Sequence, residues 1–474
     1  MQRALEGRGV SNQIVKLWHS RARRAAQSPY LRPKRDCIGL TAPLGGGHMK
    51  LGGAMLRMGT ICLAGLAGMV PFASASRADD ALSAVTQGTP IADLRARYET
   101  VNDKSKALSG NVLSLRARLG YETGVWNGFS LAFDFDAILA DPSRHNDTRN
   151  GKTAYPTIAD PGMATLNRLQ LTYATNLDTR IVLGRQRLQF GSQRFVGNAG
   201  WRQHEQTYNA LSFVNSSVKN LVVTYAYVAN VNRVFGPGDP VPATGSIGSF
   251  DSNSHLFNAV YAGIPGLRLE GYAYLLRLSQ NGPAAAMLAT AKLSTATVGA
   301  RAEYRNDLAD GLAAQINGEF AHQDDFGNNP LSISLDYGLV EGSLAYHNFT
   351  GLIGYEALGG DGTIGFSTPL ASLHPFNGWA DLFLTTPVNG LDDFYLKGSY
   401  AIPDFLGMKT LNAVLAYHDF TADRTGADLG NEWDASLELV ADKNLSFLLK
   451  YADYSGAGGL KDKSVAWLQL AYKL

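Results

Sequence analysis

The sequence predicts an all-β fold, a transmembrane antiparallel β-barrel of about 18 strands, with about 16 strands as the alternative count. Three observations predict this fold. Many segments alternate apolar and charged residues, long and short connections alternate along the chain, and the last segment keeps its alternation to the final residue. We expect residues 79–474 to form a single barrel domain.

The clearest strand pattern lies at residues 111–122, NVLSLRARLGYE. Because successive side chains of a strand point to opposite faces, one face is apolar. This face carries Leu113, Leu115, Ala117, Leu119 and Tyr121. The other carries Ser114, Arg116, Arg118, Gly120 and Glu122. An apolar outside and a charged inside are typical of a transmembrane barrel, although a soluble sheet with one wet face gives the same local pattern.

The pattern recurs in order along the chain. We expect strands near residues 94–99, 111–122, 129–139, 168–173, 181–190, 207–217, 220–232, 254–264, 267–279, 295–306, 312–322, 333–347, 351–358, 392–401, 409–420, 431–441, 444–454 and 464–474. Long connections at 141–162, 191–206, 235–253, 280–293 and 359–391 alternate with short turns. Outer-membrane barrels have long extracellular loops and short periplasmic turns, so an even strand count puts both termini in the periplasm.

The chain ends on an amphipathic strand, in which one face carries Ala466, Leu468, Leu470, Tyr472 and Leu474. Outer-membrane barrels typically end in such a strand, with an aromatic residue third from the end and a terminal Phe that the assembly machinery reads. Tyr472 fits this pattern, whereas Leu474 replaces the Phe. We therefore expect the outer-membrane assembly machinery and outer-membrane lipids as partners.

The segment from residue 49 to residue 78 has the parts of a secretory signal peptide. Lys50 and Arg57 form a basic start, residues 58–72 are mostly apolar, and residues 73–78 contain two small-x-small cleavage sites. Residues 1–48 are Arg-rich and unpatterned, so we interpret them as the product of a start codon assigned too early, with a genuine leader as the alternative. No run of eighteen apolar residues follows, and a helical membrane span is not expected.

Maturation is therefore predicted to begin near Ser76 or Asp79. Mass spectrometry of the protein recovered from outer membranes is expected to find no peptide from residues 1–48, because that segment precedes the predicted start. Detection of Met1 or Gln2 in the mature protein would contradict this interpretation of the start.

Charge and cysteine content change at the predicted cleavage site. Residues 1–78 hold 12 Lys and Arg and 2 Asp and Glu, which leaves 30 basic and 39 acidic residues after the site. A net acidic mature chain argues against a nucleic-acid partner. Both cysteines, Cys37 and Cys62, precede the site, so we expect a mature chain without disulfides.

Two long stretches resemble the alginate export family of outer-membrane porins. They are GRQRLQFGSQRFVGNAGWRQHEQTYN at 184–209 and LHPFNGWADLFLTTPVNGLDDFYL at 373–396. RYETVNDKS at 97–105 and LSLRARLGYETGVWNGFS at 113–130 are similar to the same family. The resemblance implies a Gram-negative outer-membrane barrel of about 18 strands, and one member of that family exports an acidic polysaccharide. It identifies no constriction residue on this chain.

The polar strand faces supply the candidate residues of a solute pathway. These are Arg95, Arg97, Arg116, Arg118, Glu122, Asp134, Asp136, Arg168, Arg185, Arg187, Arg301 and Glu303. Because guanidinium groups match carboxylates, arginines clustered on one wall would steer acidic solutes. The alternative is mutual neutralisation across strands by Glu122, Asp134 and Asp136.

We accordingly expect a passive channel for small hydrophilic or acidic solutes, with an acidic oligo- or polysaccharide, as in alginate export, as the cargo that the resemblance implies. Replacing Arg116 and Arg118 together by Ser is expected to shift selectivity toward cations. Folding is expected to survive, because lumen substitutions mainly tune selectivity.

We expect no enzymatic activity, cofactor or bound metal. The mature chain has His145, His204, His255, His322, His347, His374 and His418, without the HExxH spacing. Asp324–Asp325 with Asn328–Asn329 carries Ca²⁺-type oxygen ligands, but such residues are usually turns. Two alternatives stay open: a barrel-borne hydrolase, whose Ser, His and carboxylate would converge on one wall, and a surface adhesion barrel with a plugged lumen.

Overall fold

The structure is a computed structural model that describes residues 80–237, 247–281 and 283–474. Its strands are β1 (Thr89–Asp103), β2 (Gly110–Glu122), β3 (Phe129–Ala140), β4 (Met163–Ala174), β5 (Thr179–Gln186), β6 (Thr207–Asn215), β7 (Leu221–Asn232), β8 (Ser249–Ile264), β9 (Leu267–Leu275), β10 (Leu278–Ser279), β11 (Thr295–Ala309), β12 (Leu312–Asp325), β13 (Ser334–Tyr346), β14 (Phe349–Leu358), β15 (Leu391–Pro403), β16 (Thr410–Thr421), β17 (Asp428–Val440), β18 (Leu445–Gly456) and β19 (Lys463–Lys473). The helices are short: α2 (Ala81–Thr86), α3 (Ala284–Ala291), and the 3₁₀ turns η1 (Pro142–Arg144) and η2 (Phe405–Gly407).

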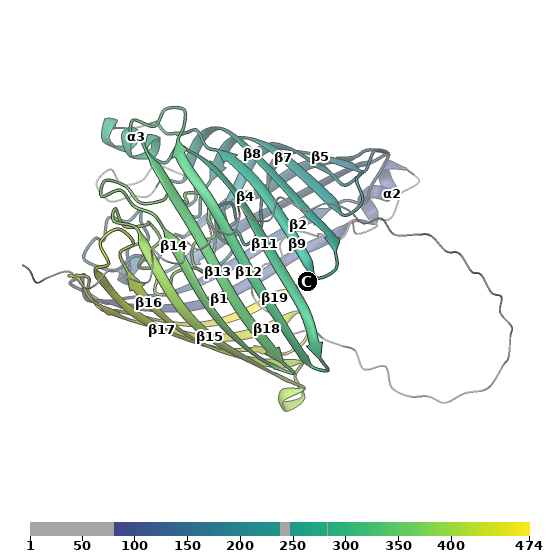
Figure 1. The fold of residues 1–474 in the computed structure, drawn as a ribbon. Coiled ribbons are helices and arrows are strands. Elements are labelled where there is room, and N and C mark those ends of the chain that lie inside the picture. The colour runs from purple at the N-terminus through teal and green to yellow at the C-terminus, as the bar shows by residue number, and fades with distance from the viewer. Residues whose placement is uncertain (1–79, 238–246, 282) are drawn as a thin grey trace, which may run out of the picture. The chain divides into compact units, whose positions relative to one another are not determined.

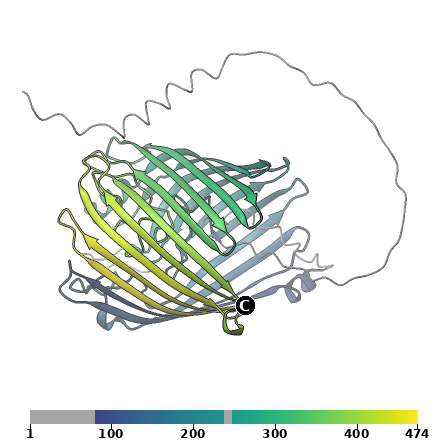
Figure 2. The same cartoon turned by 60° about the horizontal axis from the view of Figure 1, so that its bottom comes forward.

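The strands form one closed antiparallel sheet (Figures 1 and 2). Each strand pairs with its neighbours in sequence, and the first pairs with the last, so that Leu94 of β1 lies opposite Tyr472 of β19. Strand β10 continues β9, because Leu275 and Leu278 both pair with β8. Counted this way, the barrel has 18 strands, which confirms the predicted count and overturns the alternative of 16.

The two faces of the sheet carry opposite chemistry. On β2, Leu113 and Leu119 are each 55% exposed, whereas Arg116 and Arg118 are only 3% and 4% exposed. A soluble sheet with one wet face would instead bury the leucines and expose the arginines. The alternation therefore marks an apolar outside and a polar inside, as in a transmembrane barrel. No helix among the described residues is long and apolar enough to cross a membrane.

Long and short connections separate to opposite ends of the barrel, which we name the long-loop end and the short-turn end. The long-loop end carries residues 141–162, 187–206 and 359–390, and the short-turn end carries two-residue turns such as 310–311. The alternation is less regular than expected, since 422–427 at the long-loop end is also short. The barrel begins and ends at the short-turn end, where Leu474 N–H donates to Ala92 C=O at 2.8 Å.

Some strand boundaries differ from the sequence prediction. Strand β1 continues to Asp103, although the first strand was expected to end near residue 99, because Val101 turns inward and pairs with Gly110. Strand β5 ends at Gln186 instead of residue 190. The chain leaves the sheet there and enters the barrel, where polar partners replace the strand ladder.

The packed core lies inside the barrel, between the strands and two loops that fold inward. These are the inward loops 187–206 and 359–390, which meet through a parallel bridge between Val196 and Leu370. Phe195 packs edge-on against Tyr337 of β13, with ring centroids 5.1 Å apart, and contacts Phe366 of the second loop at 5.9 Å. These contacts fill part of the lumen with side chains.

The expected targeting segments, 1–48 and 49–78, lie outside the described residues, and so do Cys37 and Cys62. The part that the structure does describe from residue 80 onward contributes its strands to one sheet. At the short-turn end the outer face carries exposed aromatic rings, as expected for a membrane interface. They are Phe129, Tyr173, Tyr304, Tyr346, Phe349, Tyr400 and Tyr472.

A charge on the outer face should therefore destabilise the barrel according to its depth. Ile316, in the middle of β12, is 61% exposed on that face. Replacing it by Arg is expected to cost about 2–4 kcal/mol of folding free energy in lipid vesicles, against about 0–1 kcal/mol for Leu308→Arg near the short turns. Equal costs at the two positions, measured by urea titration, would contradict the membrane-facing assignment.

Candidate functional site

The candidate functional site is a cavity of about 910 Å³ inside the barrel. Its lining comes from both inward loops, from the 141–162 loop, from residues 233–235 after β7, and from strands β1, β11, β13–β16 and β19. A cavity lined by seven strands of a closed sheet and by loops that fold inward lies in the lumen, which the loops narrow. The side chains that hold those loops therefore decide its shape.

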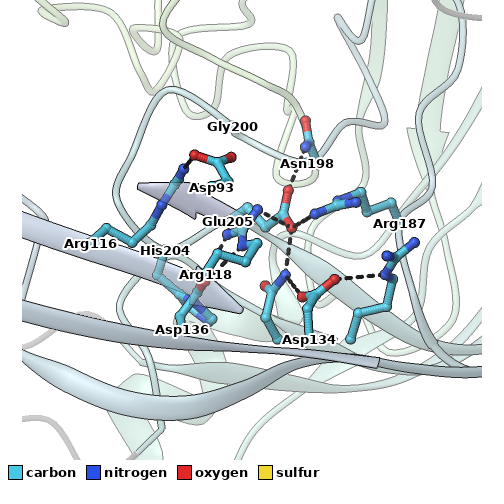
Figure 3. A network of polar contacts seen from close by, with 12 residues as sticks. Asp93, Arg116, Arg118, Asp134, Asp136, Arg187, Asn198, Gly200, His204 and Glu205 are labelled. Atoms are coloured by element: carbon cyan, nitrogen blue, oxygen red, sulfur yellow. Dashed lines mark hydrogen bonds and ion pairs between the residues drawn. The ribbon is translucent and has the colours of Figure 1, made fainter. Parts of the chain in front are cut away.

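Glu205, in the first inward loop, lies at the centre of a buried charge network (Figure 3). Its Oε1 accepts hydrogen bonds from Arg187 Nε at 2.8 Å and Asn167 Nδ2 at 2.7 Å, and lies 2.8 Å from Arg118 Nη1. Asn198 Nδ2 donates to its other oxygen at 2.7 Å. Burial alone would raise the pKa of Glu205, but Arg187 and Arg118 outweigh it and hold the pKa well below its usual range.

A second layer of the network joins the loop to strands β2, β3 and β4. Arg118 donates two hydrogen bonds to Asp136, at 2.7 and 2.9 Å, in the bidentate geometry that favours strong pairing. Asp136 also contacts His204 Nδ1 at 2.8 Å. Next to it, Arg168 Nε donates to Asp134 at 2.9 Å. These carboxylates are almost fully buried, so the arginines are their counter-charges.

Arginines of β1 and β2 also hold the loop through its backbone. Arg95 donates to the carbonyl of Trp201 at 3.1 Å, and Arg116 donates to that of Gln203 at 3.2 Å while pairing with Asp93. Arg97 donates to Gln469 of β19 at 2.7 Å, and its guanidinium lies 4.0 Å from the Trp201 ring centre. The arginine-rich wall is therefore engaged with the loop and not directly exposed to the cavity.

The structure brings together eight of the predicted residues in this network: Arg95, Arg97, Arg116, Arg118, Asp134, Asp136, Arg168 and Arg187. Arg301 and Glu303 lie apart on β11, where Arg301 pairs with Glu303 and Glu319, each at 2.8 Å. Glu122 is exposed at the end of β2. The cross-strand neutralisation weighed from the sequence thus matches the observed pairs for Asp134 and Asp136, but not for Glu122.

Arg185 is a correction to the predicted set, because it lies on the outer face of the sheet. It stands opposite Leu169, and the next outward pair on the same strands is Leu171 with Leu183. Its Nη1 donates to the carbonyl of Leu166 at 2.8 Å. The sequence interpretation grouped it with Arg187, but β5 ends between them, so the alternation no longer relates their directions.

The second inward loop contributes residues that the sequence analysis did not select. Arg202 of the first loop donates to Asp381 of the second at 2.8 Å and lies 3.5 Å from Glu99 of β1. Burial would lower the pKa of Arg202, but Glu99, Asp160 and Asp381 outweigh it and raise the pKa above its usual value. The signal was present in the two stretches that resemble the alginate export family, since residues 184–209 hold four Arg and each stretch holds one Trp and one His.

His374 links the two loops to the far wall. Its ring stacks on Trp201, with centroids 4.3 Å apart, its Nδ1 lies 2.9 Å from Asp381, and Lys450 Nζ of β18 donates to its Nε2 at 2.7 Å. This geometry requires a neutral ring with its proton on Nδ1. Burial, together with the Lys450 ammonium, lowers the pKa of His374 to about 3, although Asp381 opposes the shift.

Arg233, the first residue after β7, lines the same cavity in a different way. Its guanidinium lies 4.4 Å from the Phe250 ring centre and 4.6 Å from that of Phe235. Nη1 donates to the carbonyl of Ile247 at 3.2 Å, and no carboxylate of the described residues forms an ion pair with Arg233. Burial lowers its pKa to about 10, so the group stays charged at neutral pH.

Within the described ranges, no group of three or more His, Cys, Asp or Glu side chains is arranged to hold a metal ion. The Ca²⁺ pattern weighed from the sequence serves the turn before β13 instead. Asp325 accepts from the Ile333 N–H at 3.1 Å, and the Asn328 and Asn329 side chains donate to carbonyls of Leu278 and Ser294.

Comparison with solved structures finds the same fold. Pseudomonas aeruginosa OpdL has a TM-score of 0.58 and 16% identity, over 82% of this chain and 99% of that chain. P. aeruginosa OpdK with vanillate has a TM-score of 0.60 and 13% identity, over 82% and 99%. Acinetobacter baumannii OccAB4 has a TM-score of 0.62 and 16% identity, over 82% and 98%.

These solved structures are of outer-membrane porins with 18-strand barrels, not of alginate exporters. At such low identity the likeness establishes the fold, and the alginate part of the sequence resemblance gains no support from it. No protein-family model matches the sequence. No curated protein matches it either.

The buried pairs change the outcome expected for Arg116 and Arg118. Replacing both by Ser removes the arginine partners of Asp93 and Asp136 and one of the two arginine partners of Glu205, and breaking a buried pair costs about 3–5 kcal/mol. The double variant should therefore lose stability in urea titration, in contrast to the sequence expectation. Arg305→Ser, which removes an exposed contact with Asp307 at 3.6 Å, should cost about 0–1 kcal/mol.

Acid should loosen the inward loops through His374. Its folded pKa of about 3 lies below the ordinary value of 6.5, so between these values the unfolded chain binds a proton that the folded one does not. The stabilising contribution is present above pH 6.5 and is lost as pH falls toward 3. The urea midpoint should decrease when the pH is lowered from 7 to 4, and His374→Gln should reduce that decrease. His347→Gln, in an exposed turn, is the control and should leave the decrease unchanged. An equal decrease in the two variants would contradict the role of His374.

Proposed function

We propose that this protein is a passive outer-membrane channel for small hydrophilic solutes, with a preference for acidic ones. The observation that carries the proposal is a cavity of about 910 Å³ inside a closed barrel whose outer face is apolar. In this proposal the long-loop end faces the cell exterior, and the short-turn end, where the barrel begins and ends, faces the periplasm.

The inward loops support a small solute over a polymer. The cavity falls within the range of about 300–1,000 Å³ that is typical of small-molecule sites. An acidic polysaccharide, the cargo implied by the family resemblance, would have to pass loops joined by the Val196–Leu370 bridge and by the ion pair of Arg202 with Asp381. The proposed cargo is therefore a small acid, with a short acidic oligosaccharide as the largest candidate.

The charges around the cavity support the preference for acids. The lining holds equal numbers of basic and acidic side chains, so its overall charge is not the reason. The preference comes instead from Arg233. Its guanidinium packs against two aromatic rings and has no ion-pair partner among the described residues, so it can donate hydrogen bonds to a solute carboxylate. One similar structure was solved with vanillate, an aromatic carboxylate, which makes that acid a suitable probe.

Conductance in planar bilayers tests the proposal. The purified protein should conduct ions, and vanillate should block or permeate it. Arg233→Gln should weaken the vanillate interaction about tenfold or more, because a charge-assisted hydrogen bond contributes about 1.5–3 kcal/mol. It should also lower the anion-to-cation permeability ratio in a salt gradient.

Arg305→Gln is the matched control, since it removes an arginine that is exposed near the short turns and does not line the cavity. Unchanged vanillate block in Arg233→Gln would contradict the role of Arg233. A folded, inserted protein that conducts nothing would contradict the channel itself and favour the adhesion barrel with a plugged lumen. Block by an acidic oligosaccharide but not by vanillate would favour the acidic saccharide cargo that the family resemblance implies.

A further inference from the structure

A serine, a histidine and an aspartate line up on the outer face of the barrel, away from the lumen network. His322 lies on β12, and Ser334 and Asp336 lie on β13. His322 Nδ1 is 2.7 Å from Asp336 Oδ1, and Ser334 Oγ is 3.3 Å from His322 Nε2. Hydroxyl, imidazole and carboxylate thus stand in the order nucleophile, base and orienting acid.

The register of the two strands produces this alignment. His322 pairs with Asp336, and Asp324 pairs with Ser334, so all four side chains share one face. Phe320, two residues before His322 and 57% exposed, fixes that face as the outer one. Ser334 lies diagonally from His322, within reach of Nε2, the ring nitrogen that also lies 3.2 Å from Asp324 Oδ1.

The alignment sits where the apolar belt ends toward the long loops. Below it, the outward positions are apolar: Ile316 and Phe320 on β12, and Val340 and Leu344 on β13, are all more than half exposed. Above it, the 326–333 loop begins. In a membrane this height is the border between hydrocarbon and headgroups, where the ester bonds of lipids lie.

Open surface leads from the three residues into the belt. Gly338 stands opposite Phe320, and a Cβ added to it would meet no atom within 4 Å. Added Cβ atoms at Gly318 and Gly342 would also approach nothing closer than 3.9 Å. Because these glycines carry no side chains, we expect an acyl chain to lie against the exposed apolar side chains of Phe320, Val340 and Ile316.

We propose that Ser334, His322 and Asp336 form an esterase site for carboxylic esters that carry an apolar acyl chain. The site does not involve the lumen, so its test is independent of the test of the channel function. Ser, His and a carboxylate thus meet on the outer wall, which is the arrangement that a barrel-borne hydrolase requires.

The reaction balances with water as the only co-substrate. Ser334 Oγ bonds to the ester carbonyl carbon as its proton passes to His322 Nε2, while Asp336 keeps the other ring proton on Nδ1. The protonated Nε2 can donate a hydrogen bond to Asp324 Oδ1, 3.2 Å away. The ester C–O bond then breaks as this proton passes from Nε2 to the departing alcohol oxygen, which leaves the acyl-serine. Water then attacks the acyl-serine with His322 as base, releases the acid and restores the serine.

The test uses the full folded chain in detergent micelles. A fluorophosphonate probe should label Ser334, as identified by peptide mass spectrometry, and p-nitrophenyl dodecanoate should be hydrolysed. Ser334→Ala should abolish both, and His322→Gln should lower both by about 10²-fold or more, since a general base contributes about 10²–10⁴-fold. The matched control is His255→Gln, an outward histidine bonded to Tyr225 instead of a serine, which should change neither.

A variant at Gly338 tests binding of the acyl chain separately from the reaction at Ser334. At Gly338 an added Cβ meets no atom within 4 Å, and Gly338→Leu should slow hydrolysis of p-nitrophenyl dodecanoate more than that of p-nitrophenyl acetate, which has no long acyl chain. Absence of Ser334 labelling in folded protein would overturn the proposal, as would hydrolysis that persists in Ser334→Ala. Equal effects of Gly338→Leu on both esters would overturn the acyl-chain assignment.

Discussion

Closure of the sheet between β1 and β19 is the constraint on which the other features depend. A strand that faces lipid has no water to bond its backbone, so every N–H and C=O must pair within the protein. The ladder that joins Leu94 to Tyr472 removes the last open edge. With the backbone satisfied, the outer side chains are free to be apolar, and the inner ones, sheltered from lipid, are free to be charged.

The sheltered interior has its own requirement, because a buried charge must be paired. The barrel meets it by bringing two loops inside. Glu205 supplies the carboxylate for Arg118 and Arg187, and Arg202 supplies the guanidinium for Glu99 and Asp381. The same ion pairs neutralise the barrel wall and position the loops. The shape of the cavity and the charge balance of the lumen therefore depend on the same residues.

On the outer face of the barrel the side chains must be apolar, and polar groups are tolerated only at the edge of the apolar belt. His322, Ser334 and Asp336 lie at that border, with Phe320 and Gly338 directly below them. A hydrogen-bonded trio of this kind would be unremarkable on a soluble protein. In the proposed esterase site, this border brings the trio to the depth at which the ester bonds of lipids occur.

The sequence was enough to predict the barrel. Alternation in segments such as residues 111–122, the loop rhythm and the final strand indicate the fold and about 18 strands, because the period of two is local, whereas the structure excludes the alternative of 16. It also identified the arginines of β1 and β2 as inward. It could not give their partners, since Glu205 lies 87 residues after Arg118 and Asp381 lies 179 after Arg202. Only the tertiary structure decided which charges meet, that Arg185 turns outward, and that Ser334 reaches His322, because each depends on strand register and loop entry.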